Sequence, residues 1–175
     1  LLNRTINMLV ENNISLNKVH VFVVEEEYSD YVNTLPEPCK IVVGRKGIAA
    51  QRNFIATYFL EGQPIVSLDD DIKSIQQLNE SDTSIGNTAK KTNKIYDLET
   101  LIYNTFFKLN SYGLTLASIY PVNNYFFMRH NETLDCRFCM GAFRIYFNIK
   151  KLEIRTYNLL EDYETTLKYY QHFGC

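Results

Sequence analysis

Three consecutive aspartates, Asp69, Asp70 and Asp71, follow a short apolar run at residues 64–68 that predicts a buried strand. In open α/β sheets, ligands bind at the carboxyl ends of strands. If the extended backbone continues, Asp69 and Asp71 share one face. Two such carboxylates repel each other unless a cation lies between them, and their oxygens suit Mg²⁺ or Mn²⁺ with substrate phosphates as further ligands. The alternative is a solvated acidic turn that caps the next helix.

A second candidate site lies between a predicted strand and a predicted helix, where Gly44 and Gly47 bracket two basic side chains, one of them Lys46. Backbone N–H groups at a helix N-terminus form an anion site together with Lys and Arg. The spacing is not that of a P-loop. Arg52 lies on the otherwise apolar face of the helix, so a buried guanidinium there needs an anion, either Asp69 or a substrate diphosphate. The alternative is a surface loop with a solvated arginine.

Carboxylates stand at two further element ends. Glu25 follows the apolar run 19–24 and could accept hydrogen bonds from a ribose or a base, although a solvated turn explains it equally well. Glu161 and Asp162 begin the last predicted helix, where the helix dipole alone favours acids. A carboxylate that faces a cleft at that position could also act as a general base.

These residues need a framework, and the hydrophobic pattern predicts alternating strands and helices, which favours an α/β fold. A helix capped by Asp97 and Gly113 is the best defined of these elements. Residues 79–94 are polar and predict a flexible loop. Strands are predicted at 19–24, 40–43, 64–68, 114–119 and 142–147, and helices at the start of the chain, at 47–60, at 98–112 and from residue 160 onward.

The last predicted helix has an apolar stripe that we expect to face the core, formed by Leu160, Tyr163, Leu167 and Tyr170. A doubly wound domain normally opens with a central strand, whereas this sequence opens on a helix and ends where a helix cap would lead into another strand. We therefore expect one domain over residues 1–175 that lacks its opening strand and its C-terminal end.

Length and composition set outer limits on function. The 175 residues carry a net charge of −2, with 46% hydrophobic and 22% charged residues, which indicates an ordered globular chain. Near-neutral charge argues against bulk electrostatic binding of nucleic acid, although a local groove is still allowed. No apolar run approaches the roughly 20 residues of a membrane span, and the start lacks signal-peptide features. We expect a cytoplasmic protein, in a host cell or a virion if the source is viral.

The cysteines offer one possible metal or redox motif. Cys136 and Cys139 have C-x-x-C spacing, but a closed zinc site needs four ligands and the sequence has no second close pair. We expect reduced thiols, without zinc and without a disulfide.

The order of these motifs resembles that of glycosyltransferases of the GT-A fold. That family has a strand ending in an acid, a glycine-containing turn, a helix carrying Ala-Arg-Asn, a strand ending in Asp-x-Asp and a later Glu-Asp pair. The matching residues are Glu25, 44–47, Gln51-Arg52-Asn53, 69–71 and Glu161-Asp162, with Gln51 in place of the usual alanine. A narrower resemblance, to TET-associated glycosyltransferases of phages and large DNA viruses, rests on residues 119–128, 140–143 and 161–167.

The resemblance implies a Rossmann-like mixed sheet flanked by helices and a metal-dependent transfer of sugar. The donor would be a nucleotide-sugar, specifically a UDP-sugar, and the acceptor a hydroxymethylated base in DNA. Asp69 and Asp71 would hold Mn²⁺ or Mg²⁺, and Asp162, or else Glu161, would deprotonate the acceptor hydroxyl. Donor-binding residues would be Glu25, Gly44, Lys46, Arg52, Asn53 and Asp69. Two alternatives are a nucleotidyltransferase or nuclease that uses the aspartates, and a non-catalytic module of a virion or scaffold.

Overall fold

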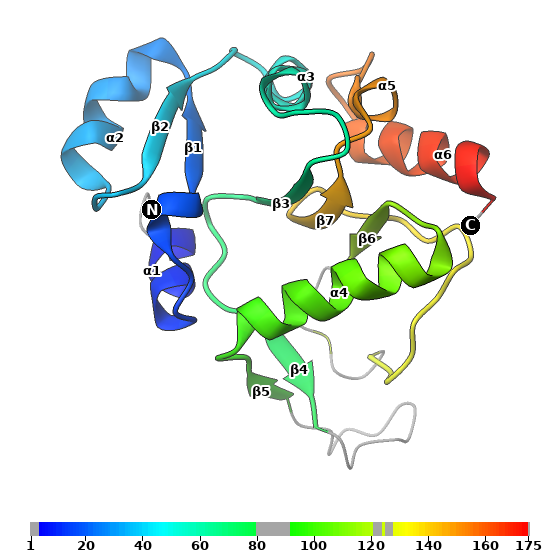
Figure 1. Ribbon diagram of the computed structural model, residues 1–175. Coiled ribbons are helices and arrows are strands. Elements are labelled where there is room, and N and C mark those ends of the chain that lie inside the picture. The colour runs from blue at the N-terminus through cyan, green and yellow to red at the C-terminus, as the bar shows by residue number, and fades with distance from the viewer. Residues whose placement is uncertain (1–3, 80–91, 121–123, 125–127, 175) are drawn as a thin grey trace.

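The computed structural model describes residues 4–79, 92–120, 124 and 128–174, which form a mixed α/β arrangement of helices and small sheets (Figure 1). The helices are α1 (Arg4–Glu11), α2 (Tyr28–Thr34), α3 (Ile48–Tyr58), α4 (Leu98–Tyr112), α5 (Lys150–Glu153) and α6 (Glu161–Phe173), with 3₁₀ turns η1 (Leu16–Lys18) and η2 (Glu25–Glu27). The strands are β1 (His20–Val23), β2 (Lys40–Val43), β3 (Pro64–Leu68), β4 (Gln76–Leu78), β5 (Thr92–Lys94), β6 (Leu116–Ser118) and β7 (Phe143–Phe147).

The strands of the described residues form three separate sheets. β1 and β2 are parallel, with His20 opposite Lys40. β7 lies between β3 and β6 and is antiparallel to both, and β4 pairs with β5. The α/β class is therefore confirmed, but the single mixed sheet is not observed. The reason is that, among the described residues, β1 pairs only with β2 and β3 only with β7, so that one edge of each has no partner strand there.

Contacts made by α3 show that β1, β2 and β3 point in the same direction. Helix α3 starts beyond the end of β2 and runs back, so that Phe59 just past its C-terminus stacks edge-on against His20 at the start of β1, with ring centroids 5.3 Å apart. From the first half of α3, Arg52 reaches Asp69 just beyond β3. The carboxyl ends of the three strands consequently lie on the same side of the molecule, where the candidate residues are found.

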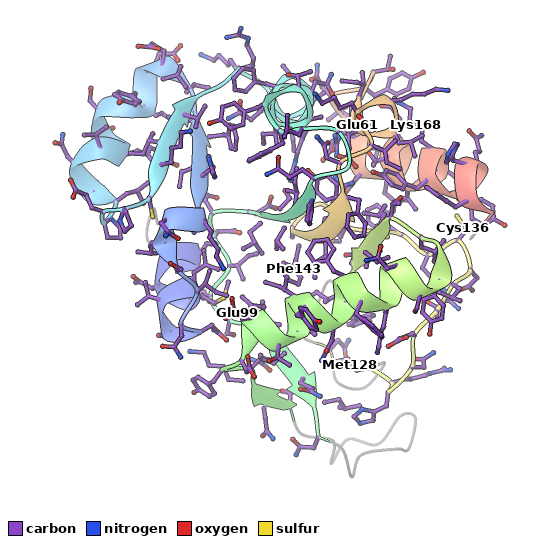
Figure 2. All side chains as sticks on the ribbon, viewed as in Figure 1. Glu61, Glu99, Met128, Cys136, Phe143 and Lys168 are labelled. Carbon is purple, nitrogen blue, oxygen red and sulfur yellow. The ribbon has the colours of Figure 1, made fainter. Side chains whose placement is uncertain are left out.

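One hydrophobic core joins α1, α4 and β7. Its buried members include Met8, Leu98 and Ile145, and Figure 2 shows Phe143 between β7 and α4. Helix α4 has the predicted caps: the Asp97 carboxylate accepts a hydrogen bond from the Thr100 N–H, and Gly113 adopts a left-handed conformation at φ 67°.

The sequence-based bounds match the structure closely where the apolar runs are short and sharply ended. The predicted strands at 40–43 and 64–68 coincide with β2 and β3. The sequence pattern missed α2 and α5, which have only seven and four residues. It also missed β4 and β5, and β5 falls inside the predicted loop at 79–94. These short elements depend on tertiary pairing more than on local pattern.

Helix α6 is oriented opposite to our expectation. Its predicted inward stripe is exposed, at 40–68% of each residue's surface, whereas the residues that pack inward are Glu161, Thr165, Thr166 and Tyr169. The packing of α6 is decided by polar anchors: the Tyr169 hydroxyl donates to Glu153 at 2.8 Å, and the Thr166 hydroxyl accepts from the Cys139 N–H at 3.1 Å. An apolar stripe alone therefore gave the wrong face of this helix.

Candidate functional site

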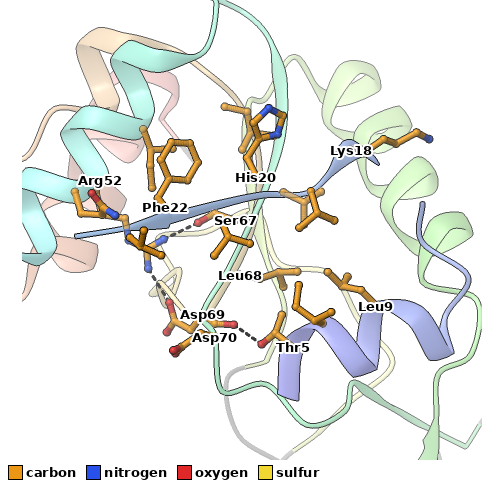
Figure 3. A pocket seen from close by; sticks show the side chains of 18 of the residues that line it. Thr5, Leu9, Lys18, His20, Phe22, Arg52, Ser67, Leu68, Asp69 and Asp70 are labelled. Carbon is orange, nitrogen blue, oxygen red and sulfur yellow. Dashed lines mark hydrogen bonds and ion pairs between the residues drawn. The ribbon is translucent and has the colours of Figure 1, made fainter. Parts of the chain in front are cut away.

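The three aspartates form a turn rather than an extended segment. The backbone of Asp69 still pairs with β7 through its N–H and the Ala142 carbonyl, 3.0 Å apart, but Asp70 and Asp71 form a turn and are exposed. The alternation that would place Asp69 and Asp71 on one face therefore does not apply. The start of α1 fixes this turn, because the Thr5 hydroxyl donates to the Asp69 carbonyl at 2.6 Å and accepts from the Ile72 N–H at 3.0 Å (Figure 3).

Arg52 connects the aspartate turn to the protein interior. Its guanidinium donates to the Asp69 carboxylate at 2.9 Å, to the Ser67 hydroxyl at 2.5 Å and to the Gly141 carbonyl at 3.2 Å. Its side chain is only 12% exposed. Of the two anions that the sequence suggested for Arg52, the structure supplies the carboxylate of Asp69 (Figure 3).

The Glu161-Asp162 pair reaches the same place from α6, and its two carboxylates have different surroundings. Glu161 is buried, accepts a hydrogen bond from Arg155 and lies 3.9 Å from the Arg52 Nε. Asp162 is partly exposed, and its Oδ2 accepts a long, 3.4 Å hydrogen bond from the Gly141 N–H. Glu161 is thus held as a structural ion, while Asp162 keeps the freedom that a base requires.

Gly141, just before β7, lies between these groups. Its N–H faces Asp162 and its carbonyl faces Arg52. A Cβ added here would lie 3.2 Å from the Arg52 guanidinium and 3.4 Å from the Glu161 carboxylate, a tight fit. Neither spacing nor charge in the sequence identifies Gly141 or Thr5 as a site residue. Gly141 acts through its own N–H and carbonyl, and Thr5 bonds to the backbone of the aspartate turn.

A buried cluster of charges stands behind the site. Arg144 in β7 makes two hydrogen bonds to Glu153, at 2.7 and 3.3 Å, and Arg155 lies 3.2 Å from the other side of the same carboxylate. Burial alone would raise the pKa of Glu153, but the two guanidinium groups outweigh it and hold the pKa below its ordinary value. Burial, and then the charge of Glu153, raises the pKa of the neighbouring Tyr146 to about 12.

The 44–47 turn has the expected position between β2 and α3. Gly47, at φ 97°, is the N-cap of α3 in a conformation that disfavours other residues. The Gln51 side chain, which replaces the alanine of the resemblance, accepts from the Arg45 N–H at 2.6 Å and occupies the space where a Gly44 Cβ would be. Lys46 is exposed and lies 3.4 Å from Glu26.

Four of the six predicted donor-binding residues, Glu25, Gly44, Lys46 and Asn53, do not line the cavity described below. Glu25 is exposed at the start of η2. Asn53 has both atoms of its amide engaged by the backbone of Arg155, at 2.9 and 2.7 Å, and ties α3 to the segment after α5. The structure thus gathers Arg52, Asp69 and the 161–162 pair, and leaves Glu25 and Asn53 apart from them.

A cavity of about 850 Å³ lies between β1 and β3 and extends along both strands, from Lys18 and Gln63 near their starts to the aspartate turn beyond the end of β3. Its rim at that end includes Arg45, Gly47, Arg52 and residues 69–71. Within the described part of the chain, no group of three or more His, Cys, Asp or Glu side chains could enclose a metal. Mg²⁺ is usually held by one or two carboxylates plus phosphates and waters, so the exposed carboxylates of Asp70 and Asp71 could supply part of such a ligand set but not the whole of it.

No protein-family model, curated protein or solved structure matches this chain.

Among the described residues, no helix combines the length and apolar character needed to cross a bilayer. The described cysteines, Cys39, Cys136 and Cys139, are free thiols, and Cys175 lies outside the described residues. Most of the 119–128 segment behind the narrower resemblance also lies outside them.

Proposed function

We propose that this protein is a metal-dependent glycosyltransferase of the GT-A type that uses a UDP-sugar. The observation that carries the proposal is that Asp69 and Arg52 pair at the rim of a cavity at the carboxyl end of β3, while Asp162 is linked to Arg52 through the backbone of Gly141. These residues come from three distant segments of the sequence. Carboxyl ends of strands are where α/β folds bind nucleotides, which supports this location.

The donor diphosphate would lie at the mouth of the cavity, between the start of α3 and the aspartate turn. Gly47 opens the N-terminus of α3, and the Arg45 guanidinium is held nearby, 5.2 Å from the centre of the Phe54 ring. Both favour an anion. Asp71, with Asp69, would hold Mn²⁺ or Mg²⁺. When bound, such a cation stabilises the negative charge that develops on the leaving diphosphate.

Asp162 is the better candidate for the base that takes the proton of the acceptor hydroxyl. Its carboxylate is partly exposed and makes one long hydrogen bond to the Gly141 backbone, besides a contact with its own helix. Glu161 is already paired with Arg155 and buried, so it cannot approach an acceptor without breaking that pair. A hydroxymethylated base in DNA remains the acceptor we propose, on the sequence resemblance alone.

Calorimetric titration of UDP with and without Mn²⁺ tests this function. We expect Mn²⁺ to strengthen UDP binding, because the diphosphate completes the coordination shell of the metal. Asp71→Asn should abolish this synergy while thermal unfolding stays unchanged, and Asp70→Asn, the neighbouring acid in the same turn, should leave it in place. Equal UDP affinity with and without Mn²⁺ would count against the proposal.

The same titrations separate the alternatives. A nucleotidyltransferase or nuclease predicts metal binding without binding of UDP-sugars. A non-catalytic module predicts neither metal binding nor binding of UDP-sugars. The Asp69–Arg52 pair would then only stabilise the fold. A transfer assay with UDP-glucose and hydroxymethylated DNA then tests the acceptor, since label should enter DNA only when the base carries a hydroxymethyl group.

A further inference from the structure

The cavity between β1 and β3 has an unusual pair of walls. One wall is the edge of β1 that faces away from β2, and the other is the edge of β3 that faces away from β7. Both strands point in the same direction, as the contacts of α3 establish. Two parallel strand edges therefore face each other across one space, and neither has a partner strand among the described residues.

The hydrogen-bond pattern shows which backbone groups point into this space. The carbonyls of Val19 and Val23 accept from β2, so by the alternation of a ladder Phe22 points its N–H the other way. On the opposite wall, Asp69 bonds to β7, and the same alternation turns the N–H groups of Val66 and Leu68 away from β7. Unpaired N–H and C=O groups thus border the cavity on two sides, and such groups are costly to bury without partners.

The two faces of the cavity are already covered by helices. On one face, Ile55 and Phe59 come from the α3 side. On the other face, Ile6 and Leu9 of α1 line the cavity together with Ile102 of α4. Figure 3 shows Leu9 and Phe22 among the side chains around this space. The arrangement is that of a three-layer α/β/α domain with a gap in the middle layer.

The size of the gap matches one strand. A strand takes about 3.3 Å of length per residue, about 4.8 Å of width and about 10 Å between packed layers, so five residues fill roughly 800 Å³. The cavity has about 850 Å³. A solvent-filled space of this size between apolar walls would forfeit the burial that the surrounding helices provide.

We propose that this cavity is a slot for one extended strand, parallel to β1 and β3, supplied by the polypeptide on the amino-terminal side of α1. The position of α1 selects this source. Thr5, in the first turn of α1, bonds to the carbonyls of Asp69 and Asp70 at the carboxyl end of the slot. A parallel strand leaves the slot at that end and can enter α1 directly, which then leads through η1 into β1 as a β–α–β unit.

The slot also dictates what the strand must be. Because helices cover both faces, its side chains must be apolar at successive positions, as in buried parallel strands. Its backbone would satisfy Phe22 on one side and Val66 and Leu68 on the other. It would join the two small sheets into one continuous sheet. A strand in the slot occupies most of the cavity, so the proposed donor would bind at its rim beside the aspartate turn and not inside it.

Amide hydrogen exchange, measured residue by residue by NMR, tests the slot without any substitution. A polypeptide that extends beyond residue 1 on its amino-terminal side, termed the whole polypeptide, is compared with residues 1–175 alone. We expect the Phe22, Val66 and Leu68 amides to exchange on the order of 10- to 100-fold more slowly in the whole polypeptide, because each gains a hydrogen bond. The neighbouring amides of Val21 and Ile65, which already face β2 and β7, are the internal reference and should be protected in both forms.

Fast exchange of the three slot amides in the whole polypeptide overturns the proposal. Protection that increases with protein concentration also overturns it, since a second copy would then supply the strand. A pair of proline variants gives an independent measurement. Val66→Pro, which removes an N–H facing the slot, should lower the melting temperature of the whole polypeptide more than that of residues 1–175, whereas Ser67→Pro, which removes one facing β7, should lower both.

Discussion

Two groups of charged residues in this protein differ in burial and in the number of their partners. The interior group, Arg144, Glu153 and Arg155, is almost fully buried, and the Glu153 carboxylate is shared between the two arginines and Tyr169. The mouth group is the aspartate turn, where Asp70 and Asp71 are exposed. Only the second group has carboxylates exposed to a new partner.

This difference separates structural charge from charge available for function. Removing charges from water costs several kcal/mol per ion, so buried ions persist only when their partners are fixed. Glu161 belongs with the interior group, since it pairs with Arg155. Arg52 joins the two groups, because it contacts Asp69 on one side and lies near Glu161 on the other.

The largest expected effect is the loss of the central carboxylate of the interior group. Glu153→Ala leaves Arg144 and Arg155 buried without an anion, and we expect a loss of about 3–5 kcal/mol in the free energy of unfolding. Urea denaturation measures it. Glu99→Ala, which removes an exposed pair with Lys18 at 3.5 Å, is the control and should cost about 0–1 kcal/mol. Equal losses in the two variants would erase the comparison.

Arg52→Ala should have the next largest effect because it acts on both groups. It removes three hydrogen bonds and leaves the Asp69 carboxylate without its guanidinium partner, so we expect a loss of about 2–3 kcal/mol in the free energy of unfolding. If the proposed function is right, UDP affinity should fall as well. Arg52→Lys keeps the charge but not the planar fork, and it should recover only part of either loss. Full recovery by lysine would show that charge alone matters here.

Glu164 makes a smaller, pH-dependent contribution to the free energy of unfolding. Burial alone would raise the pKa of this carboxyl, but Lys168 and the N–H groups of Thr156 and Tyr157 outweigh it and lower the pKa to about 2. A depressed pKa stabilises the folded state above the unfolded value near 4.5, and this stability is lost as pH falls from about 4.5 toward 2. With solvent screening we expect about 1–2 kcal/mol. Urea midpoints at pH 7, 4 and 3 should show a shallower decline for Glu164→Gln than for the unmodified protein.

The sequence predicted those parts of the fold whose causes are local. Two strands and the caps of α4 follow from short apolar runs, one aspartate and one glycine. The face of α6 could not be predicted in this way, because Tyr169 and Thr166 anchor it to distant segments. The sequence does indicate that Arg144 is unusual, because it is the single charge inside the apolar run 143–147. Its partner Glu153 is nine residues away with no periodic relation, so only the folded structure reveals the pair.

The candidate site shows the same division. The sequence limits the partner of Arg52 to Asp69 or a substrate diphosphate, because a guanidinium on an apolar helix face needs an anion, and the structure shows the Asp69 carboxylate. The roles of Thr5 and Gly141 could not be predicted, since they act through backbone contacts to residues far away in the sequence. The separate environments of Glu161 and Asp162 could not be foreseen either, because adjacent acids at a helix start look alike until one is buried.

The smallest expected effect on stability is the most informative about function. Asp162→Asn keeps the shape of the side chain and affects two exposed or long hydrogen bonds, from the N–H groups of Gly141 and Tyr163, so the free energy of unfolding should change by about 0.5 kcal/mol or less. Glu161→Gln, one residue away, removes the charge opposite Arg155 and should cost about 1.5–3 kcal/mol. If Asp162 is the base, Asp162→Asn should also keep UDP and Mn²⁺ binding and lose turnover, because only proton transfer is removed. Sugar transfer at the rate of the unmodified protein would mean that another residue is the base. A large loss of stability would mean that Asp162 is a structural charge, like the residues of the interior group.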